Sequence, residues 1–208
     1  MAQTTEAPGG YAVQLTATDA RTLSRWWGIP WLGNAVRFIL LIPHFLIMFV
    51  LAIGMVVIFL LGWIPILGTG RVPLFQARWI EEILRRGSRI GGYGLYLMPG
   101  GYPPLGGGRP VPTDVDFDLG DRSINRWWGI PVIGLFVRAV LAIPHFIVLW
   151  FLSVVSGLTL IVLWIPILVT GRYPEWAMIL YSSLLRYQVR VGAYILMLPV
   201  PYPPFSLS

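Results

Sequence analysis

The chain of 208 residues is strongly apolar and basic: 56% of its residues are hydrophobic, 12% are charged, and the formal net charge is +6. Its mean hydropathy of +0.72 leaves too little polar surface to cover a soluble globule of this length, which predicts a membrane protein. The absence of cysteine excludes a disulfide framework, a thiolate nucleophile and a cysteine metal site.

A repeat runs through the chain. The hexapeptide RWWGIP at residues 25–30 recurs at residues 126–131, and IPHF, WIPIL and TGR recur at the same offset of 101 positions. Self-similarity on this scale indicates a duplicated unit. We therefore predict a flexible N-terminus at residues 1–10, membrane module 1 at 11–105, a linker at 106–112 and membrane module 2 at 113–208.

Each module is expected to begin with a short strand outside the membrane, because polar and apolar residues alternate at 11–19 and 113–121. The second segment concentrates acids that loosely resemble a calcium loop: Asp114, Asp116, Asp118 and Asp121. It lacks the glycine and the distant glutamate of such a loop. The segment therefore favours a strand with a solvated acidic face, whose acids could also pair with arginines of the same protein.

Paired tryptophans come next, just before a long apolar run. Trp26 and Trp27 occupy the first copy of the hexapeptide, and Trp127 and Trp128 occupy the second. Tryptophan is enriched at membrane–water interfaces, and a neighbouring arginine can reach lipid phosphate. The four tryptophans are predicted to be interfacial anchors that fix the depth of each module.

The apolar run contains 33 consecutive uncharged residues between Arg37 and Arg71, and the same number between Arg138 and Arg172. One straight helix would be about 50 Å long, against about 30 Å for the hydrocarbon core. Either prolines bound a single span, or the run is a helical hairpin that turns near Gly54, and near Ser156 and Gly157 in the second module. The turn chemistry for a hairpin is weak, but a hairpin keeps all arginines on one side of the membrane, so we favour it.

Helical segments follow at 74–97 and 175–198. In the first, Arg78, Glu82, Arg85 and Arg89 share one face at spacings of four, three and four residues, and the second retains Arg186 and Arg190. Several arginines near a bilayer centre would be costly. Both segments are therefore predicted to be amphipathic helices at the interface.

These motifs resemble those of a known family. The IPHF motif, an apolar run that ends in TGRYP, the helix LLRYQVRVGAY and the terminal YPPFSL are similar to the bacterial membrane family called domain of unknown function 4389. The resemblance covers nearly the whole chain as two tandem copies, of which the first departs further. It implies a protein of the bacterial cytoplasmic (inner) membrane, multi-pass or hairpin-inserted, and implies no activity.

The only histidines, His44 and His145, occupy matching positions. If the modules pack about a pseudo-twofold axis, the two imidazoles could approach each other and ligate a haem or a metal. The alternative is that each histidine bonds a backbone carbonyl or lies at the headgroup boundary. The sequence favours that alternative, so we expect no cofactor and no metal.

Arginine clusters are the main candidates for binding lipid or a partner. All fifteen cations are arginine, whose guanidinium group binds phosphates and carboxylates in a bidentate fork. The candidate residues are Arg37, Arg71, Arg85, Arg89, Arg138, Arg172, Arg186 and Arg190. Ordinary snorkelling at helix ends explains the same pattern.

The sequence thus predicts an all-α membrane protein of two tandem modules, each a long hydrophobic helix or helical hairpin plus an amphipathic interfacial helix, with short extended segments outside the membrane. We expect no catalytic residues and no nucleic-acid partner. The expected role is an accessory or scaffold subunit that contacts anionic lipid and other membrane protein subunits. The alternatives are a small channel or transporter, or a haem- or quinone-binding redox subunit that uses His44 and His145.

Overall fold

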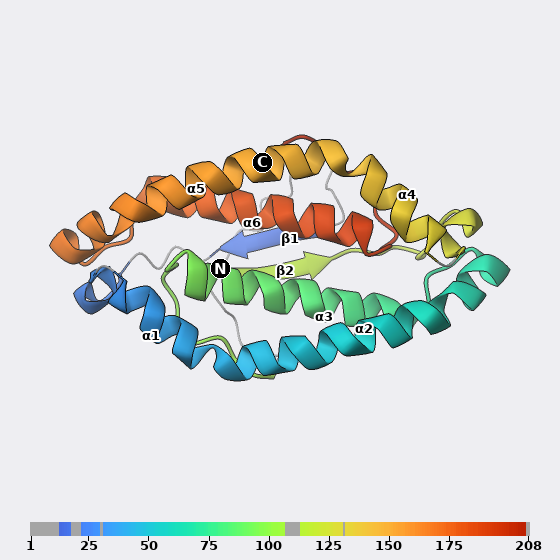
Figure 1. The fold of residues 1–208 in the computed structure, drawn as a ribbon, viewed down its shortest axis with the longest axis horizontal. Coiled ribbons are helices and arrows are strands. Elements are labelled where there is room, and N and C mark those ends of the chain that lie inside the picture. The colour runs from blue at the N-terminus through green and yellow to red at the C-terminus, as the bar shows by residue number, and fades with distance from the viewer. Residues whose placement is uncertain (1–12, 18–21, 30, 107–112, 131, 207–208) are drawn as a thin grey trace, which may run out of the picture.

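The computed structural model describes residues 13–17, 22–29, 31–106, 113–130 and 132–206 (Figure 1). The first half contains strand β1 (Val13–Ala17), a 3-10 turn η1 (Arg25–Gly28), helices α1 (Leu32–Leu40), α2 (Ile42–Thr69) and α3 (Leu74–Ile90), and a π turn η2 (Gly91–Leu95). The second half contains β2 (Thr113–Phe117), η3 (Arg126–Gly129), α4 (Ile133–Leu141), α5 (Ile143–Thr170) and α6 (Glu175–Ile195). The predicted N-terminus and nearly all of the predicted linker lie outside the described residues.

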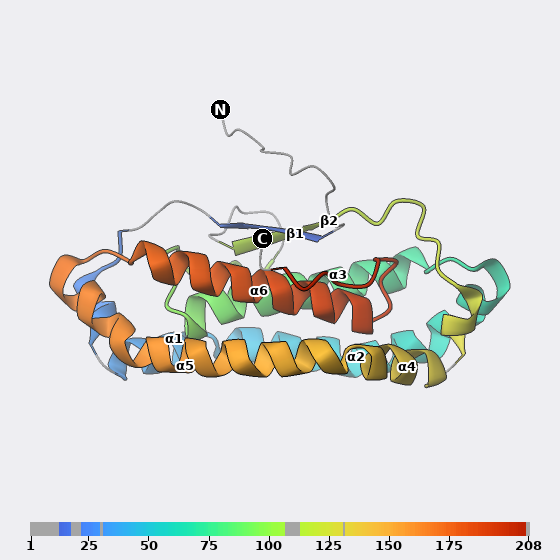
Figure 2. The ribbon, with the colours of Figure 1, turned by 90° about the horizontal axis from the view of Figure 1, so that it is seen from above.

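The elements form three layers, which Figure 2 shows edge-on. The first layer contains α1, α2, α4 and α5, the middle layer contains α3 and α6, and the β1–β2 pair covers the other side of the middle layer. Helices α3 and α6 run back along α2 and α5, so all four lie along the long axis of a flat molecule (Figures 1 and 2). The order of the layers places the most apolar helices together on one face.

The favoured hairpin in the apolar run is wrong. Helices α2 and α5 are each a single uninterrupted helix of 28 residues, and each continues beyond its internal proline, Pro65 or Pro166. Both helices end at a glycine in the left-handed conformation, Gly70 or Gly171. Most of each uncharged run is therefore one long helix, about 42 Å long at about 1.5 Å per residue, which follows the end of the shorter helix α1 or α4.

The residue proposed for the hairpin turn, Gly54, has a packing role instead. A Cβ atom at this position would overlap Cζ2 of Trp79, so glycine is needed for the indole of α3 to pack on α2. The indole Nε1 of Trp79 donates a hydrogen bond to the carbonyl of Leu51 at 3.0 Å. This contact joins the first layer to the middle layer.

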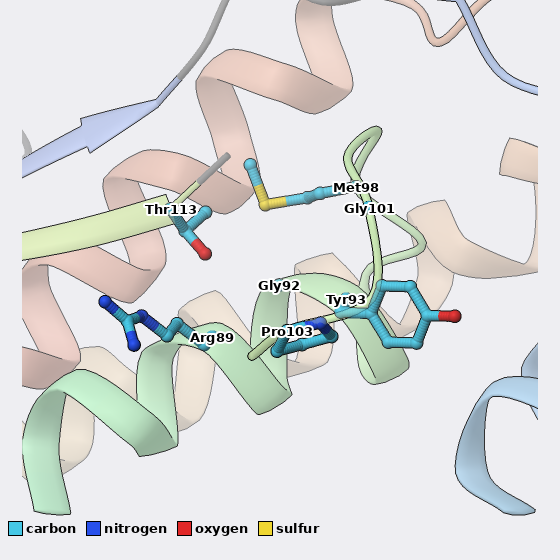
Figure 3. Close-up of a pocket in the computed structure, with 7 residues that line it drawn as sticks. All are labelled: Arg89, Gly92, Tyr93, Met98, Gly101, Pro103 and Thr113. Carbon is cyan, nitrogen blue, oxygen red and sulfur yellow. The ribbon is translucent and has the colours of Figure 1, made fainter. Parts of the chain in front are cut away.

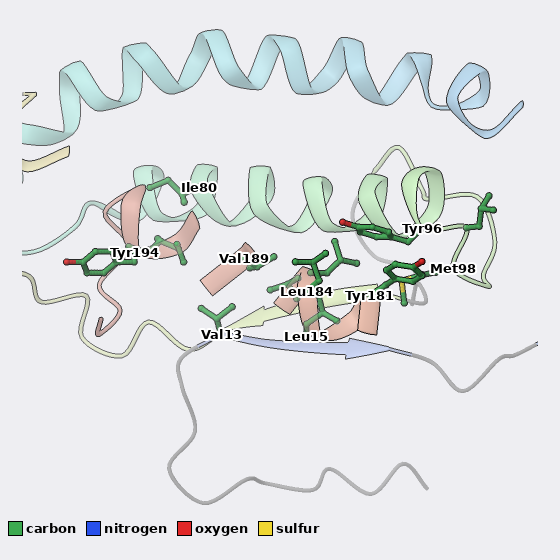
Figure 4. Packing of buried hydrophobic residues seen from close by; sticks show 14 of the residues in the cluster. Val13, Leu15, Ile80, Tyr96, Met98, Tyr181, Leu184, Val189 and Tyr194 are labelled. Carbon is green, nitrogen blue, oxygen red and sulfur yellow. The ribbon is translucent and has the colours of Figure 1, made fainter. Parts of the chain in front are cut away.

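The predicted amphipathic helices form, but they are covered on both sides. Most of the side chains along α6 are buried, including Tyr181, Leu184 and Tyr187. Figure 4 shows the main core cluster, in which side chains from α3, α6, both strands and the segment after η2 meet. The amphipathic pattern therefore reflects a middle layer between an apolar layer and a sheet.

The predicted strands are confirmed, and they pair with each other. β1 and β2 run antiparallel, with Val13 opposite Phe117 and Leu15 opposite Val115. Val13, Leu15 and Val115 are buried against the middle layer. One strand comes from each half, so this sheet joins the two halves of the chain.

The two copies of RWWG also join the halves, because each packs on the long helix of the other half. A Cβ atom on Gly28 of η1 would lie 2.6 Å from the backbone nitrogen of Leu168 in α5. A Cβ atom on Gly129 of η3 would lie 2.8 Å from Cγ2 of Ile66 in α2. The boundaries predicted for the two modules therefore divide the sequence into two repeats, but in the structure each half packs against the other.

This packing predicts that Gly28→Ala and Gly129→Ala each lower the free energy of unfolding by about 1–3 kcal/mol, the usual cost of overpacking a close contact. Thermal or denaturant unfolding of the purified protein measures the effect. Gly157→Ala is the matched control, since no atom lies within 4 Å of its Cβ position in α5. It should raise stability by about 0.5–1 kcal/mol, as for an alanine that replaces a mid-helix glycine. A destabilised control would contradict the continuous helix.

Candidate functional site

The first candidate site is the exposed apolar face formed by α1, α2, α4 and α5. Only 17% of the most hydrophobic 18-residue stretch of α2 is buried inside the molecule, and only 11% of the corresponding stretch of α5. Both helices are long and apolar enough to cross a membrane, by length and composition. Their exposed side chains are large, and include Phe49, Leu60, Trp150 and Ile161. A continuous apolar surface of this size marks an interaction site.

Exposed arginines and tryptophans lie at the two ends of the molecule. Arg25 and Arg172 flank the contact between η1 and the end of α5, and Arg71 and Arg126 flank the contact between η3 and the end of α2. One tryptophan of each predicted pair is exposed: Trp26 to 77% and Trp127 to 73%. We call the arginines Arg25, Arg71, Arg126 and Arg172 the end arginines.

The other two predicted anchors point inward. Trp27 and Trp128 are half-buried, and the ring of each lies beside a buried guanidinium group. The guanidinium carbon of Arg37 is 4.7 Å from the centre of the Trp27 ring, and that of Arg138 is 5.2 Å from the centre of the Trp128 ring. Each hexapeptide thus presents one tryptophan outward and uses the other in packing.

Arg37 and Arg138 are only 1% and 3% exposed. The prediction that these two arginines contact lipid or a partner is therefore wrong. Nη1 of Arg37 donates to the carbonyls of Tyr93 at 2.7 Å and Met98 at 3.1 Å. Nη1 of Arg138 donates to the carbonyls of Tyr194 at 2.7 Å and Leu198 at 3.2 Å. We call each of these arrangements an arginine clamp, because it ties the first layer to the C-terminal end of a middle-layer helix.

The electrostatics of the clamp suit a buried cation. The carbonyls at a helix C-terminus carry partial negative charge, and aromatic rings add a favourable cation–π interaction. The Arg37 guanidinium carbon lies 4.5 Å from the centre of the Tyr93 ring. Burial lowers the pKa of Arg37 to about 10, which is still far enough above neutral pH for the side chain to stay charged.

Arg85, Arg89, Arg186 and Arg190 face the core and the sheet. Arg89 is buried and forms a hydrogen-bonded ion pair with Asp114 at 3.0 Å, and Nε of Arg85 donates to the carbonyl of Val115 at 3.1 Å. Arg186 reaches the carbonyl of Leu15 at 3.4 Å. The suggestion that the strand acids pair with arginines of the same protein is confirmed for Asp114, and this pairing directs Arg85 and Arg89 of α3 towards the sheet.

The two histidines are buried in separate clusters. His44 Nε2 lies 3.1 Å from the carbonyl of Pro103, and its ring meets that of Tyr102. His145 Nδ1 lies 2.6 Å from the hydroxyl of Tyr187, and its ring stacks on Phe205. The backbone-carbonyl alternative therefore describes His44, whereas His145 bonds a side chain. The part of the chain that the structure describes contains no group of three or more metal-ligating side chains.

Two cavities open beside the long helices, at matching positions of the two halves. One, of about 250 Å³, lies between α2 and the start of α4, and includes Trp63 and Trp128. The other, of about 640 Å³, lies between α5 and the start of α1, and includes Trp27 and Trp164. A third cavity, between Arg89, Met98 and Thr113, holds only about 10 Å³, enough for one water molecule (Figure 3).

One protein family model matches part of the second half of the chain. Residues 133–206 match a family model described as "Domain of unknown function (DUF4389)". The match spans α4, α5 and α6, so it includes the second arginine clamp and His145. It confirms the family resemblance for this part of the chain. No curated protein and no solved structure matches the chain.

The predicted binding residues do not include Arg25 and Arg126, although the arginine beside each pair of tryptophans was expected to reach lipid phosphate. Both belong to the repeated hexapeptide, and their strict recurrence is the signal that identifies them. Gln76 was missed because it lies within an amphipathic pattern as an ordinary polar residue. Its counterpart at the offset of 101 is Ala177, and that difference marks a place where the halves diverge.

The clamp predicts that Arg138→Met lowers the free energy of unfolding by about 3 kcal/mol, because two carbonyls lose a charged donor in a buried site. Arg172→Met removes an exposed arginine of the same half and should change stability by less than about 0.5 kcal/mol. Thermal unfolding of the two variants in the same detergent measures the difference. Equal stabilities would show that the clamp contributes nothing.

Proposed function

We propose that the protein is a non-enzymatic membrane protein that lies flat in one leaflet, with its apolar layer in the hydrocarbon and its charged layers towards water. The observation that supports this most strongly is the one-sided exposure of α2 and α5, which are 17% and 11% buried in their most hydrophobic stretches. The role that suits such a flat, three-layered molecule is an accessory or scaffold subunit. Its sheet side would be available to other membrane protein subunits.

The layered architecture supports a flat orientation over an upright one. Helix α3 packs along α2, so an upright α2 would carry Arg78, Glu81 and Glu82 to the same membrane depth. A charged residue at the bilayer centre costs about 2.5–3.5 kcal/mol on insertion scales. A flat orientation lets the whole apolar layer meet lipid while α3, α6 and the sheet stay at or above the headgroups.

The end arginines support contact with anionic lipid. They are exposed at both ends of the molecule, beside the exposed Trp26 and Trp127. Tryptophan favours the headgroup layer, and arginine attracts lipid phosphates there. We infer further that the two halves are tandem copies of one family module, since the strands, the 3-10 turns and the first-layer helices recur with matching lengths in the same order and both halves carry an arginine clamp. A bacterial inner-membrane location rests on the family resemblance alone.

The flat orientation predicts that Ser24 and Thr69, at opposite ends of the first half, lie on the same side of the membrane. The chain has no cysteine, so a Ser24→Cys, Thr69→Cys double variant carries only these two thiols. In sealed vesicles, a membrane-impermeant maleimide should leave each molecule with either two adducts or none, as counted by mass spectrometry. An upright α2 would give one adduct on every molecule. Phe49→Cys, on the apolar face, is the control that reacts only after detergent is added.

The end arginines predict selective retention of anionic lipid. Replacing all four with glutamine should remove about 1 kcal/mol of attraction for each arginine near an anionic surface. We expect the anionic share of the lipid that copurifies from mixed phosphatidylglycerol and phosphatidylcholine vesicles to fall to the bulk ratio. The total amount of bound lipid should stay the same, because the apolar face is intact. Undiminished enrichment would exclude the end arginines as the lipid-selective site.

A further inference from the structure

The 250 Å³ cavity between α2 and α4 is almost entirely apolar. Phe59, Leu60, Trp63, Trp128 and Leu135 contribute to its wall, and Gln76 of α3 is its one side chain with an amide. Leu60 and Val132 also belong to the exposed apolar face, so the cavity adjoins that face. Its volume approaches the lower end of the range for small-molecule sites.

Gln76 is an unusual residue for such a place. Its side chain is 1% exposed, and within the described residues no hydrogen bond reaches its buried Oε1 atom. Leaving a buried polar group without a partner is strongly unfavourable. A polar group from outside the chain would satisfy the amide.

The second half shows that packing alone does not require this amide. In the first half the amide of Gln76 packs directly on Gly62, where a Cβ atom would overlap the amide oxygen, so this side chain requires glycine on α2. At the corresponding positions the second half has Ala177 and Leu163, both fully buried. The second half thus has the large Leu163 on the long helix and the small Ala177 on the middle-layer helix, where the first half has the small Gly62 and the large Gln76. A fully apolar pair therefore fits between these two helices, and the first half has an amide there instead, beside the smaller cavity.

We propose that this cavity binds a neutral, single-chain lipid through a hydroxyl group hydrogen-bonded to Gln76. This inference rests on the proposed position of the apolar layer in the membrane, which gives the cavity access to lipid. The hydrocarbon chain fills the space among the aromatic and aliphatic side chains. A hydroxyl both donates and accepts a hydrogen bond, so it satisfies the amide whichever of its two polar atoms faces the cavity.

The residues around the cavity discriminate between possible occupants. An ionised fatty acid is disfavoured, because none of the described residues that line the cavity carries a positive charge. Water alone is disfavoured as well, because a buried water needs two to four polar partners and the wall is almost entirely apolar. A neutral lipid alcohol such as a monoacylglycerol meets both conditions.

Photo-crosslinking of the full-length protein in lipid nanodiscs tests the proposal. The probe is a monoacylglycerol with a diazirine in its chain, and the comparison probe is the same molecule with its hydroxyls methylated. We expect the hydroxyl probe to label peptides that contain Trp63 or Trp128 at least tenfold more than the methylated probe. Equal labelling by the two probes at these peptides, or labelling spread evenly over the apolar face, would overturn the proposal.

A volume-conserving variant keeps the test independent of folding. Gly62→Leu combined with Gln76→Ala copies the second half, and should unfold at the same temperature as the wild type or higher because it removes an unsatisfied polar group. We expect this variant to lose the tenfold preference for the hydroxyl probe. If it keeps the preference, Gln76 is not the recognition residue and the proposal fails. The two-adduct cysteine result reports the flat orientation separately, so failure of lipid recognition and failure of the proposed orientation are distinguishable.

Discussion

A buried arginine near the start of each long apolar helix holds the apolar layer against the charged layers. Arg37 and Arg138 each donate to two backbone carbonyls at the C-terminal end of a middle-layer helix. A guanidinium group suits this site because it stays charged when buried and lies flat against aromatic rings. Without these clamps, α1 and α4 would contact the middle layer through few buried side chains, since the arginine and one glycine are the buried residues of each helix.

The contacts of the two RWWG turns also hold the three layers together. Because η1 packs on α5 and η3 packs on α2, each half fixes the far end of the long helix of the other half. The strand pair adds a third connection between the halves on the opposite side of the middle layer. The long helices are therefore held at both ends and along one side, which leaves one continuous apolar face. That arrangement connects the fold to the proposed position in a single leaflet.

Much of this architecture could be read from the sequence. The offset of 101 positions correctly predicts matching elements in the two halves, and the alternation at 113–121 predicts β2. The hairpin prediction was wrong because α2 and α5 continue without a break through the positions proposed for the turn. The argument from charge placement assumed upright helices, whereas in the proposed flat orientation all flanking charges can face the same side without any turn. Gly54 looked like a turn residue, whereas its lack of a side chain accommodates the indole of Trp79.

The functional surface was harder to predict, because it depends on which arginines the fold buries. The sequence treats Arg37 and Arg71 alike, as the two ends of one uncharged run, yet one is buried in a clamp and the other is exposed at an end. The distinction arises from contacts with Tyr93 and Met98, about sixty positions away along the chain. Pairing over such sequence separations leaves no periodic signal. The same holds for Gln76, whose isolation becomes visible only when the cavity is formed.

The flat orientation is tested most directly by the membrane depth of three positions on one face of α2. Leu46, Ile53 and Leu60 lie seven residues apart and are all exposed. Each can carry a spin label on a single introduced cysteine, and power saturation with oxygen and a nickel chelate then gives its depth. A flat helix places all three labels at the same depth, within about one helical turn of 5.4 Å, and we expect this result. An upright helix would separate the first and last labels by about 21 Å along the membrane normal, at about 1.5 Å per residue, and such a separation would exclude the flat orientation.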